Sequence, residues 1–270
     1  MAWVETESLS FTARHETEDT DSAQRSLDAL EDLRLRLEDR FEEVPADITV
    51  VIHPTPGWLS AAHPFLPAAR WAAAPAGRRY LAGWAMASEL HILNDDYLDR
   101  RAAGEDSLAA LRGTAQRLYA QLVIGANNER LPPPWGPRRF SRYLRWAWLI
   151  EGGAQYFAGQ VSLFRAAVST RLRNGGRPAF PPSPRDAIIL GGTVFDLLDS
   201  ERGPQACEVL VSRLRRGGAR AALEIAFGEP PARIERAWRR YLDELPRRRV
   251  APRELDQELS FLGDEDRLSS

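Results

Sequence analysis

The chain has 270 residues, of which 44% are hydrophobic and 27% are charged, and its formal net charge is -2. This composition is typical of a folded protein with a hydrophobic core, and it excludes a wholly disordered chain and a global attraction to nucleic acid or anionic membranes. All 36 basic residues are arginines, which excludes mechanisms that need a lysine amine, such as a Schiff base or a P-loop phosphate site.

The first 105 residues predict a small sheet with at least one helix. Residues 8–16 alternate Leu9, Phe11 and Ala13 with polar residues, the pattern of a half-buried strand. Asp21 then caps a predicted amphipathic helix, and the apolar stripe of this helix consists of Leu27, Leu30, Leu33, Leu37 and Phe41.

Three further strands are predicted in this part of the chain. Residues 47–54 form a continuous apolar run rich in β-branched residues, which favours a central strand. Residues 78–86 and 88–93 predict two more strands, and we place the second of them near an edge of the sheet.

From residue 106 onward the apolar period is helical. Residues 106–128 predict one long helix, and a loop rich in Pro and Arg leads from it to a helix that contains Glu151. After a second such loop, four more helices are predicted at residues 192–202, 204–216, 219–228 and 230–245. We expect Cys207, the only cysteine, to be a small buried core residue in the second of these four.

Strands followed by helices indicate an α+β fold. We expect one domain over residues 1–245, with a sheet-rich part at 1–105 and a helical part at 106–245. Residues 246–270 form a basic cluster followed by acids, and we expect a charged and partly disordered tail. No basic leader and no long apolar run occur, so we expect a cytoplasmic protein with no membrane or nucleic-acid partner.

The segment WLIEGGAQYFAG, residues 148–159, carries a single acid, Glu151, in an otherwise apolar or small helix. It resembles the third-ligand helix of the gluzincin metallopeptidases, the thermolysin-like clan, in which the glutamate binds zinc. The order of strands, helices and loops is also similar, as is the W-x-x-Y-L helix near the end, here with Trp238 and Tyr241. The resemblance covers most of the chain from about Leu9 to Leu245 and implies a gluzincin-like fold.

The resemblance also implies an upstream helix with the motif H-E-x-x-H, in which two histidines grip zinc and the glutamate activates a water molecule. Aligned with that helix, this chain has Arg117 and Gln121 at the two histidine positions and Leu118 at the glutamate position. Arginine stays protonated, leucine has no base and glutamine is a poor zinc ligand. We therefore expect no catalytic residue and no metal at these positions; any metal ligand would be Glu151 alone.

A carboxylate inside an apolar helix needs a cation, a metal or a proton as its partner. We hypothesise that the guanidinium of Arg117 fills the position of zinc and pairs with Glu151. The alternative is that Glu151 lies at the edge of the helical region and pairs with an arginine of residues 136–145.

The histidines, His15, His53, His63 and His91, lie far apart in sequence and none shows the i, i+4 spacing of a metal pair, so a structural role is favoured for each. His91 alone lies near acids. If the protein is an active zinc hydrolase, it would draw ligands from His91 or a nearby acid together with Glu151.

In the family, the strand that precedes the metal helix often holds a peptide by strand addition, and Gly83, Trp84 and Ala85 occupy the similar place here. The favoured function is a catalytically inactive, metallopeptidase-like protein that has lost its zinc site and binds a peptide or another protein. The alternatives are an active zinc-dependent hydrolase with non-standard ligands, in which zinc is the cofactor, and a helical scaffold. The sequence leaves the oligomeric state open.

Overall fold

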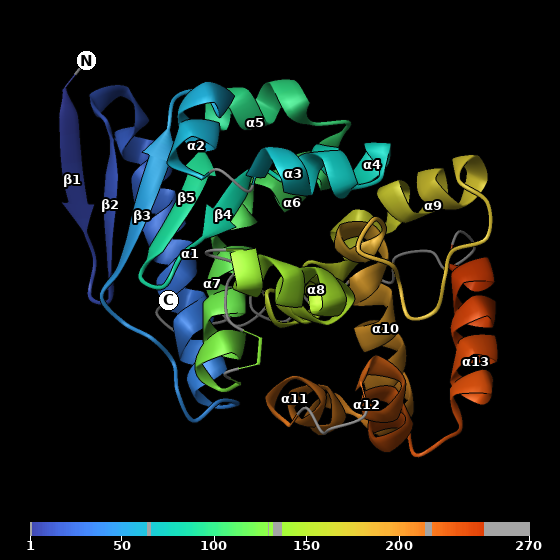
Figure 1. Ribbon diagram of the computed structural model, residues 1–270. Helices are drawn as coiled ribbons and strands as arrows, with labels where there is room; N and C mark the ends of the chain where they lie inside the picture. Colours follow the sequence, from blue (N-terminus) through green and yellow to red (C-terminus); the bar gives the residue numbers. More distant parts are fainter. Residues whose placement is uncertain (1, 64–65, 129, 132–136, 214–217, 246–270) are drawn as a thin grey trace, which may run out of the picture.

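A computed structural model describes residues 2–63, 66–128, 130–131, 137–213 and 218–245 (Figure 1). Within these residues lies a five-stranded sheet of order β1-β2-β3-β5-β4. Pairs β2–β3 and β3–β5 are parallel, and the outer pairs β1–β2 and β4–β5 are antiparallel. The strands are β1 (Trp3–Glu7), β2 (Phe11–Glu16), β3 (Ile48–His53), β4 (Gly83–Ala85) and β5 (Glu89–Leu93). The apolar run in β3 is central, as predicted.

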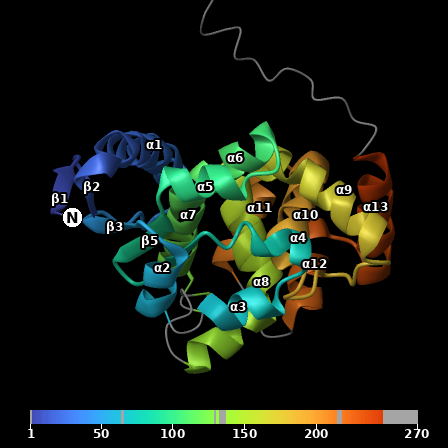
Figure 2. The ribbon, with the colours of Figure 1, turned by 90° about the horizontal axis from the view of Figure 1, so that it is seen from above.

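Helices cover both faces of the sheet (Figure 2). The amphipathic helix α1 (Thr20–Glu38) packs on β2, α7 (Thr114–Ala126) packs on β4 and β5, and α2 (Pro56–Ala62) covers β3 and β5 from the opposite side. The predicted leucine stripe of α1 is buried, and Phe41, just beyond the helix, is buried with it. Because side chains alternate along a strand, Val50 and Ile52 face α1 and α7, whereas His53 faces α2.

Four details of the predicted N-terminal part are wrong. Leu9 lies before β2 in a turn and is 97% exposed. The helix begins after Asp19, rather than at a cap formed by Asp21. Only Gly83–Ala85 of the strand predicted at 78–86 is extended, since α4 (Pro75–Arg78) includes its start. The edge strands are β1 and β4, and β5 lies inside the sheet between β3 and β4.

The sequence pattern missed β1 and most of the short helices. β1 has polar or half-exposed residues throughout because it is an edge strand with little to bury. The helices α2, α3 (Leu66–Ala72), α4 and α5 (Asp95–Arg101) have at most seven residues, too few to show a helical period. Single 3-10 turns lie at Thr17–Asp19 and Val161–Phe164.

The long helix predicted at residues 106–128 is two helices, α6 (Glu105–Arg112) and α7, divided at Gly113. The amide of Gln160 donates to the carbonyl oxygen of Gly113 at 2.7 Å, and a Cβ on Gly113 would lie 2.3 Å from that amide. A tertiary contact therefore requires glycine at the break. The remaining helices are α8 (Pro137–Phe157), α9 (Arg165–Asn174), α10 (Ala187–Arg202), α11 (Pro204–Ser212), α12 (Gly218–Phe227) and α13 (Pro231–Glu244).

The four C-terminal helices predicted from periodicity are present as α10 to α13, although α10 begins at Ala187 rather than Gly192. The α+β class is thus confirmed. Cys207 is fully buried, as expected, and burial raises the pKa of its thiol to about 12. No helix in the described part of the chain has the length and apolar character needed to cross a bilayer. The predicted tail at 246–270 lies outside the described residues.

Candidate functional site

The two helices that carry the sequence-predicted site residues pack side by side between the sheet and α10 (Figure 1). On α7, Arg117 and Gln121 are one turn apart and both reach toward α8, because residues four apart share one helix face. Leu118 points instead toward β4, where its Cδ1 would lie 2.8 Å from a Cβ on Gly83. On the facing helix, α8 supplies Tyr143 and Glu151.

The glycine that follows Glu151 sets how closely α8 approaches α10. A Cβ on Gly152 would lie 2.4 Å from the carbonyl oxygen of Gly191, and one on Gly191 would lie 2.6 Å from that of Trp148. The two backbones therefore touch, and α8 is fixed against α10 directly beside the glutamate. This contact holds Glu151 in the protein interior, where only 3% of it is exposed.

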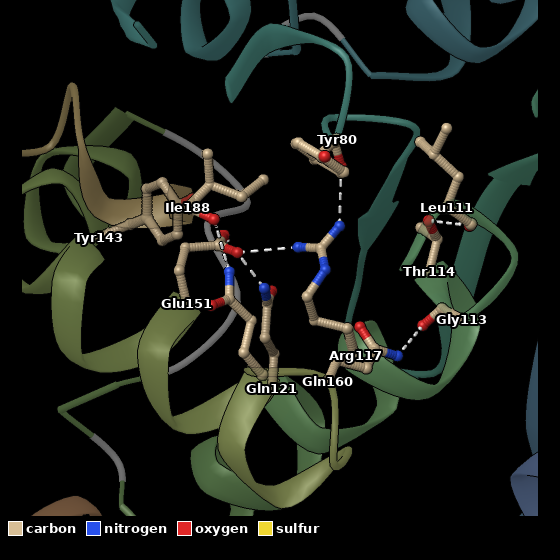
Figure 3. A network of polar contacts seen from close by, with 11 residues as sticks. Tyr80, Leu111, Gly113, Thr114, Arg117, Gln121, Tyr143, Glu151, Gln160 and Ile188 are labelled. Atoms are coloured by element: carbon tan, nitrogen blue, oxygen red, sulfur yellow. Dashed lines mark hydrogen bonds and ion pairs between the residues drawn. The ribbon is translucent and has the colours of Figure 1, made fainter. Parts of the chain in front are cut away.

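The carboxylate of Glu151 is fully satisfied by three side chains (Figure 3). Arg117 Nη1 donates to Oε2 at 2.8 Å, while Gln121 Nε2 and Tyr143 Oη donate to Oε1 at 3.1 and 2.5 Å. Arg117, 2% exposed, also donates through Nη2 to the carbonyl oxygen of Tyr80 at 2.8 Å. The hypothesised ion pair between Arg117 and Glu151 is confirmed, and the alternative pairing with an arginine of residues 136–145 is wrong.

The surroundings of Tyr143 keep its hydroxyl protonated. Burial, and then the negative charge of Glu151, raise the pKa of Tyr143 well above its usual value. Tyr143 is therefore a neutral donor at any physiological pH, and Glu151 accepts from it. Arg117 balances the charge of Glu151, and neutral side chains donate its other hydrogen bonds. This explains why the apolar helix tolerates a single acid.

The residues present do not fit zinc. The Arg117 guanidinium and the Gln121 amide both point donors at Glu151, and Leu118 offers no base, so the cluster has one anionic ligand and a fixed cation. A cavity of about 10 Å³ remains between β4 and the cluster, at the lower limit for one water molecule. The arrangement can balance a buried charge, but it lacks the ligands and the space for metal-assisted hydrolysis.

The predicted peptide-binding residues Gly83, Trp84 and Ala85 are β4, the edge strand next to this cluster. Leu93 donates to the carbonyl oxygen of Ala82, and Met86 donates to that of Glu89. Since bonded and non-bonded pairs alternate in an antiparallel ladder, the N–H and C=O groups of Gly83 and Ala85 point away from β5.

That outer side of β4 is covered. The start of α8 packs on the strand, with the rings of Phe140 and Tyr143 centred 6.5 and 6.2 Å from the Trp84 ring. Trp84 is 5% exposed and Ala85 is 1% exposed. β4 is therefore an edge strand whose outer side is covered by the protein itself.

Sequence spacing did not reveal that three of the four histidines gather on the other face of the sheet. His53 Nε2 lies 2.9 Å from His91 Nδ1, and His91 Nε2 lies 3.2 Å from the Glu89 carboxylate. The ring of His63, from the turn after α2, is centred 4.4 Å from that of His91. A carboxylate only accepts, so His91 donates to Glu89 and accepts from His53.

These three histidines are buried and neutral. Burial, and then the neighbouring His91, lower the pKa values of His53 and His63 to about 4. Burial also lowers the pKa of His91, against the opposing effect of Glu89. His53 Nδ1 and His63 Nε2 have no hydrogen-bond partner in the described residues. No group of three His, Cys, Asp or Glu side chains in this part of the chain is placed to hold a metal ion.

Comparisons with known proteins add no relative. No protein-family profile, no curated protein and no solved structure matches the chain.

Proposed function

We propose that this chain is a catalytically inactive, metallopeptidase-like protein, similar to the gluzincins, in which an arginine has taken the place of zinc. The observation that carries the proposal is the 2.8 Å ion pair between Arg117 and Glu151. The two residues come from the positions that the resemblance assigns to a zinc-binding histidine and a zinc-binding glutamate. A cation at that position satisfies the glutamate and leaves no ligand free for a metal.

The protein would then act through binding, with an extended peptide or protein segment as its partner. The outward backbone groups of Gly83 and Ala85 support strand addition to β4. Binding there requires the first turns of α8 to leave Trp84, so the described conformation is the closed one. A peptide that binds should protect the amides of Gly83 and Ala85 from hydrogen exchange.

The rival function, an active zinc hydrolase that uses His91 with Glu151, has less support. His91 shares its sheet face with Trp84 and α2, whereas Glu151 contacts α7, on the other side of the sheet. Both ring nitrogens of His91 are engaged, by His53 and Glu89. The covered outer side of β4 favours the third function, a scaffold that binds no peptide at this site.

A restored motif tests the proposal directly. The triple variant Arg117→His, Leu118→Glu and Gln121→His reinstates the H-E-x-x-H pattern on α7, facing Glu151 on α8. We expect the dialysed wild type to hold no stoichiometric zinc and the triple variant to hold about one zinc per chain by elemental analysis. Adding Glu151→Gln to the triple variant should remove that zinc.

Two results would contradict the proposal. If the triple variant keeps the wild-type circular dichroism spectrum but holds no zinc, these residues are not a former metal site. If the wild type itself holds zinc that Glu151→Gln abolishes, the hydrolase function takes precedence.

A further inference from the structure

Away from β4, α4 packs on α9 (Figure 1), and residues of both helices line a second pocket. The pocket has a volume of about 310 Å³ and shares no lining residue with the cavity beside Glu151. Its wall is formed by the start of α4, the end of α9 and the segment that leads into α10. This volume falls in the range of small-molecule sites and exceeds that of a bare inorganic ion.

Three arginines line the pocket, Arg79, Arg171 and Arg185. Arg171 is neutralised by Asp186, which accepts from its Nε and Nη2 at 2.6 and 2.8 Å and is 2% exposed. Neither Arg79 nor Arg185 has a carboxylate partner among the described residues. The lining therefore carries two positive charges in excess.

Two further arginines, Arg70 and Arg101, lie near Arg79. Arg101 donates to the carbonyl oxygens of Arg78 and Arg79 at 2.8 and 3.1 Å, and Arg70 donates to that of Leu81. Burial, and then the positive charges of Arg70 and Arg79, lower the pKa of Arg101. Backbone carbonyls satisfy these guanidinium groups but do not neutralise them, so an anion in the pocket would relieve like-charge repulsion.

The other lining groups indicate what the rest of the ligand is. Thr170 and Asn174 on α9 add neutral hydrogen-bonding side chains, and Ala74, Pro75 and Ala76 add apolar surface. A ligand that fits has an oxyanion at one end and an apolar body at the other. Two excess charges match a dianion better than a monoanion, and paired guanidinium groups match the oxygens of a phosphate.

We propose that this pocket binds a small phosphate monoester with an apolar body, its phosphate held by Arg79 and Arg185 and its body placed against Ala74, Pro75 and Ala76. The two unpaired guanidinium groups supply the affinity for the dianion. The apolar surface selects for an organic phosphate over the inorganic ion. This proposal is independent of the proposed loss of a zinc site around Glu151.

Phenyl phosphate is a suitable probe, titrated calorimetrically into the full chain at low ionic strength. We expect saturable binding to one site that weakens as salt is added. Arg79→Gln and Arg185→Gln should each weaken binding about tenfold or more, because each removes charge-assisted hydrogen bonds. Arg36→Gln is the matched control, since Arg36 is an exposed arginine on α1 outside the pocket, and it should leave the affinity unchanged.

Benzoate and inorganic phosphate separate the two parts of the proposed ligand. Both should bind more weakly than phenyl phosphate, the first because it carries one charge and the second because it has no apolar body. The proposal is overturned if phenyl phosphate shows no saturable binding. It is equally overturned if Arg36→Gln weakens binding as much as Arg79→Gln and Arg185→Gln, which would indicate attraction to the arginine-rich surface as a whole.

Discussion

Two buried polar clusters lie on opposite faces of the sheet at β4. They offset the free-energy cost of burying polar groups in opposite ways. On the α7 side, Glu151 and Arg117 are both charged, and the carboxylate has a donor on each oxygen. On the α2 side, His53, His63 and His91 are all bases, with Glu89 at their exposed end. Opposite charges can stay ionised in the interior, whereas like groups must stay neutral. The first cluster should therefore be sensitive to substitution, and the second to acid.

The largest effect should come from breaking the ion pair. Glu151→Gln strands the guanidinium of Arg117 in the interior and should lower the free energy of unfolding by about 3 to 5 kcal/mol. The double variant Arg117→Leu with Glu151→Leu removes both charges and should recover most of that loss. Urea denaturation of Arg117→Leu, Glu151→Leu and the double variant gives the coupling energy. Additive losses would show that the two residues do not act as a pair.

The second prediction concerns how the buried histidines make stability depend on pH. Their unfolded pKa is near 6.5 and the folded values of His53 and His63 are about 4, so the unfolded state takes up protons first as pH falls. Stability should be fully present above pH 6.5 and decline between pH 6.5 and 4, by about 3 kcal/mol for each of the two rings.

The measurement is urea denaturation at a series of pH values, with His63→Gln as the comparison. This variant has one fewer group to protonate, so its stability should fall less steeply than that of the wild type over the same interval. Equal slopes would mean that the histidine cluster does not set the acid sensitivity.

The smallest effect compares a tyrosine that donates to a charged acceptor with a tyrosine that donates to a neutral one. Tyr143 donates to the Glu151 carboxylate, whereas the Tyr119 hydroxyl donates to the backbone carbonyl of Pro45 at 2.7 Å. Tyr143→Phe should lower the free energy of unfolding by about 2 kcal/mol and Tyr119→Phe by about 1 kcal/mol. Thermal or urea unfolding of the two matched variants measures the difference. A larger loss for Tyr119→Phe would show that Glu151 gains little from Tyr143.

The two clusters also differ in how far they can be predicted from sequence. Arg117, Gln121 and Glu151 follow from a helical motif, because residues four apart on one helix share a face wherever that helix packs. The third donor, Tyr143, gave no signal, since it lies more than two turns, about 12 Å along the axis, before Glu151 on the same helix. The histidines come from three elements, and only the parallel pairing of β3 with β5 and the turn after α2 bring them together.

The ends of the helices and strands also differ in how far the sequence predicts them. The period of α1 and of α13 is visible in the sequence, because each buries one apolar stripe. The break at Gly113 is invisible to periodicity, since apolar residues continue on both sides and Gln160, 47 residues away, decides it. Leu9 was misplaced because apolar alternation cannot say which residue ends at a turn.

The sequence by itself determined the α+β class, the central position of β3, and the presence of a lone acid on an apolar helix that faces an arginine one helix earlier. These features depend on periodicity and on the chemistry of residues close together in the chain. Only the tertiary structure decided that β4 lies at an edge of the sheet, that α8 covers its outer side, and that three histidines share one buried site. Those features depend on which distant surfaces meet, and burial there sets the charge that each side chain carries.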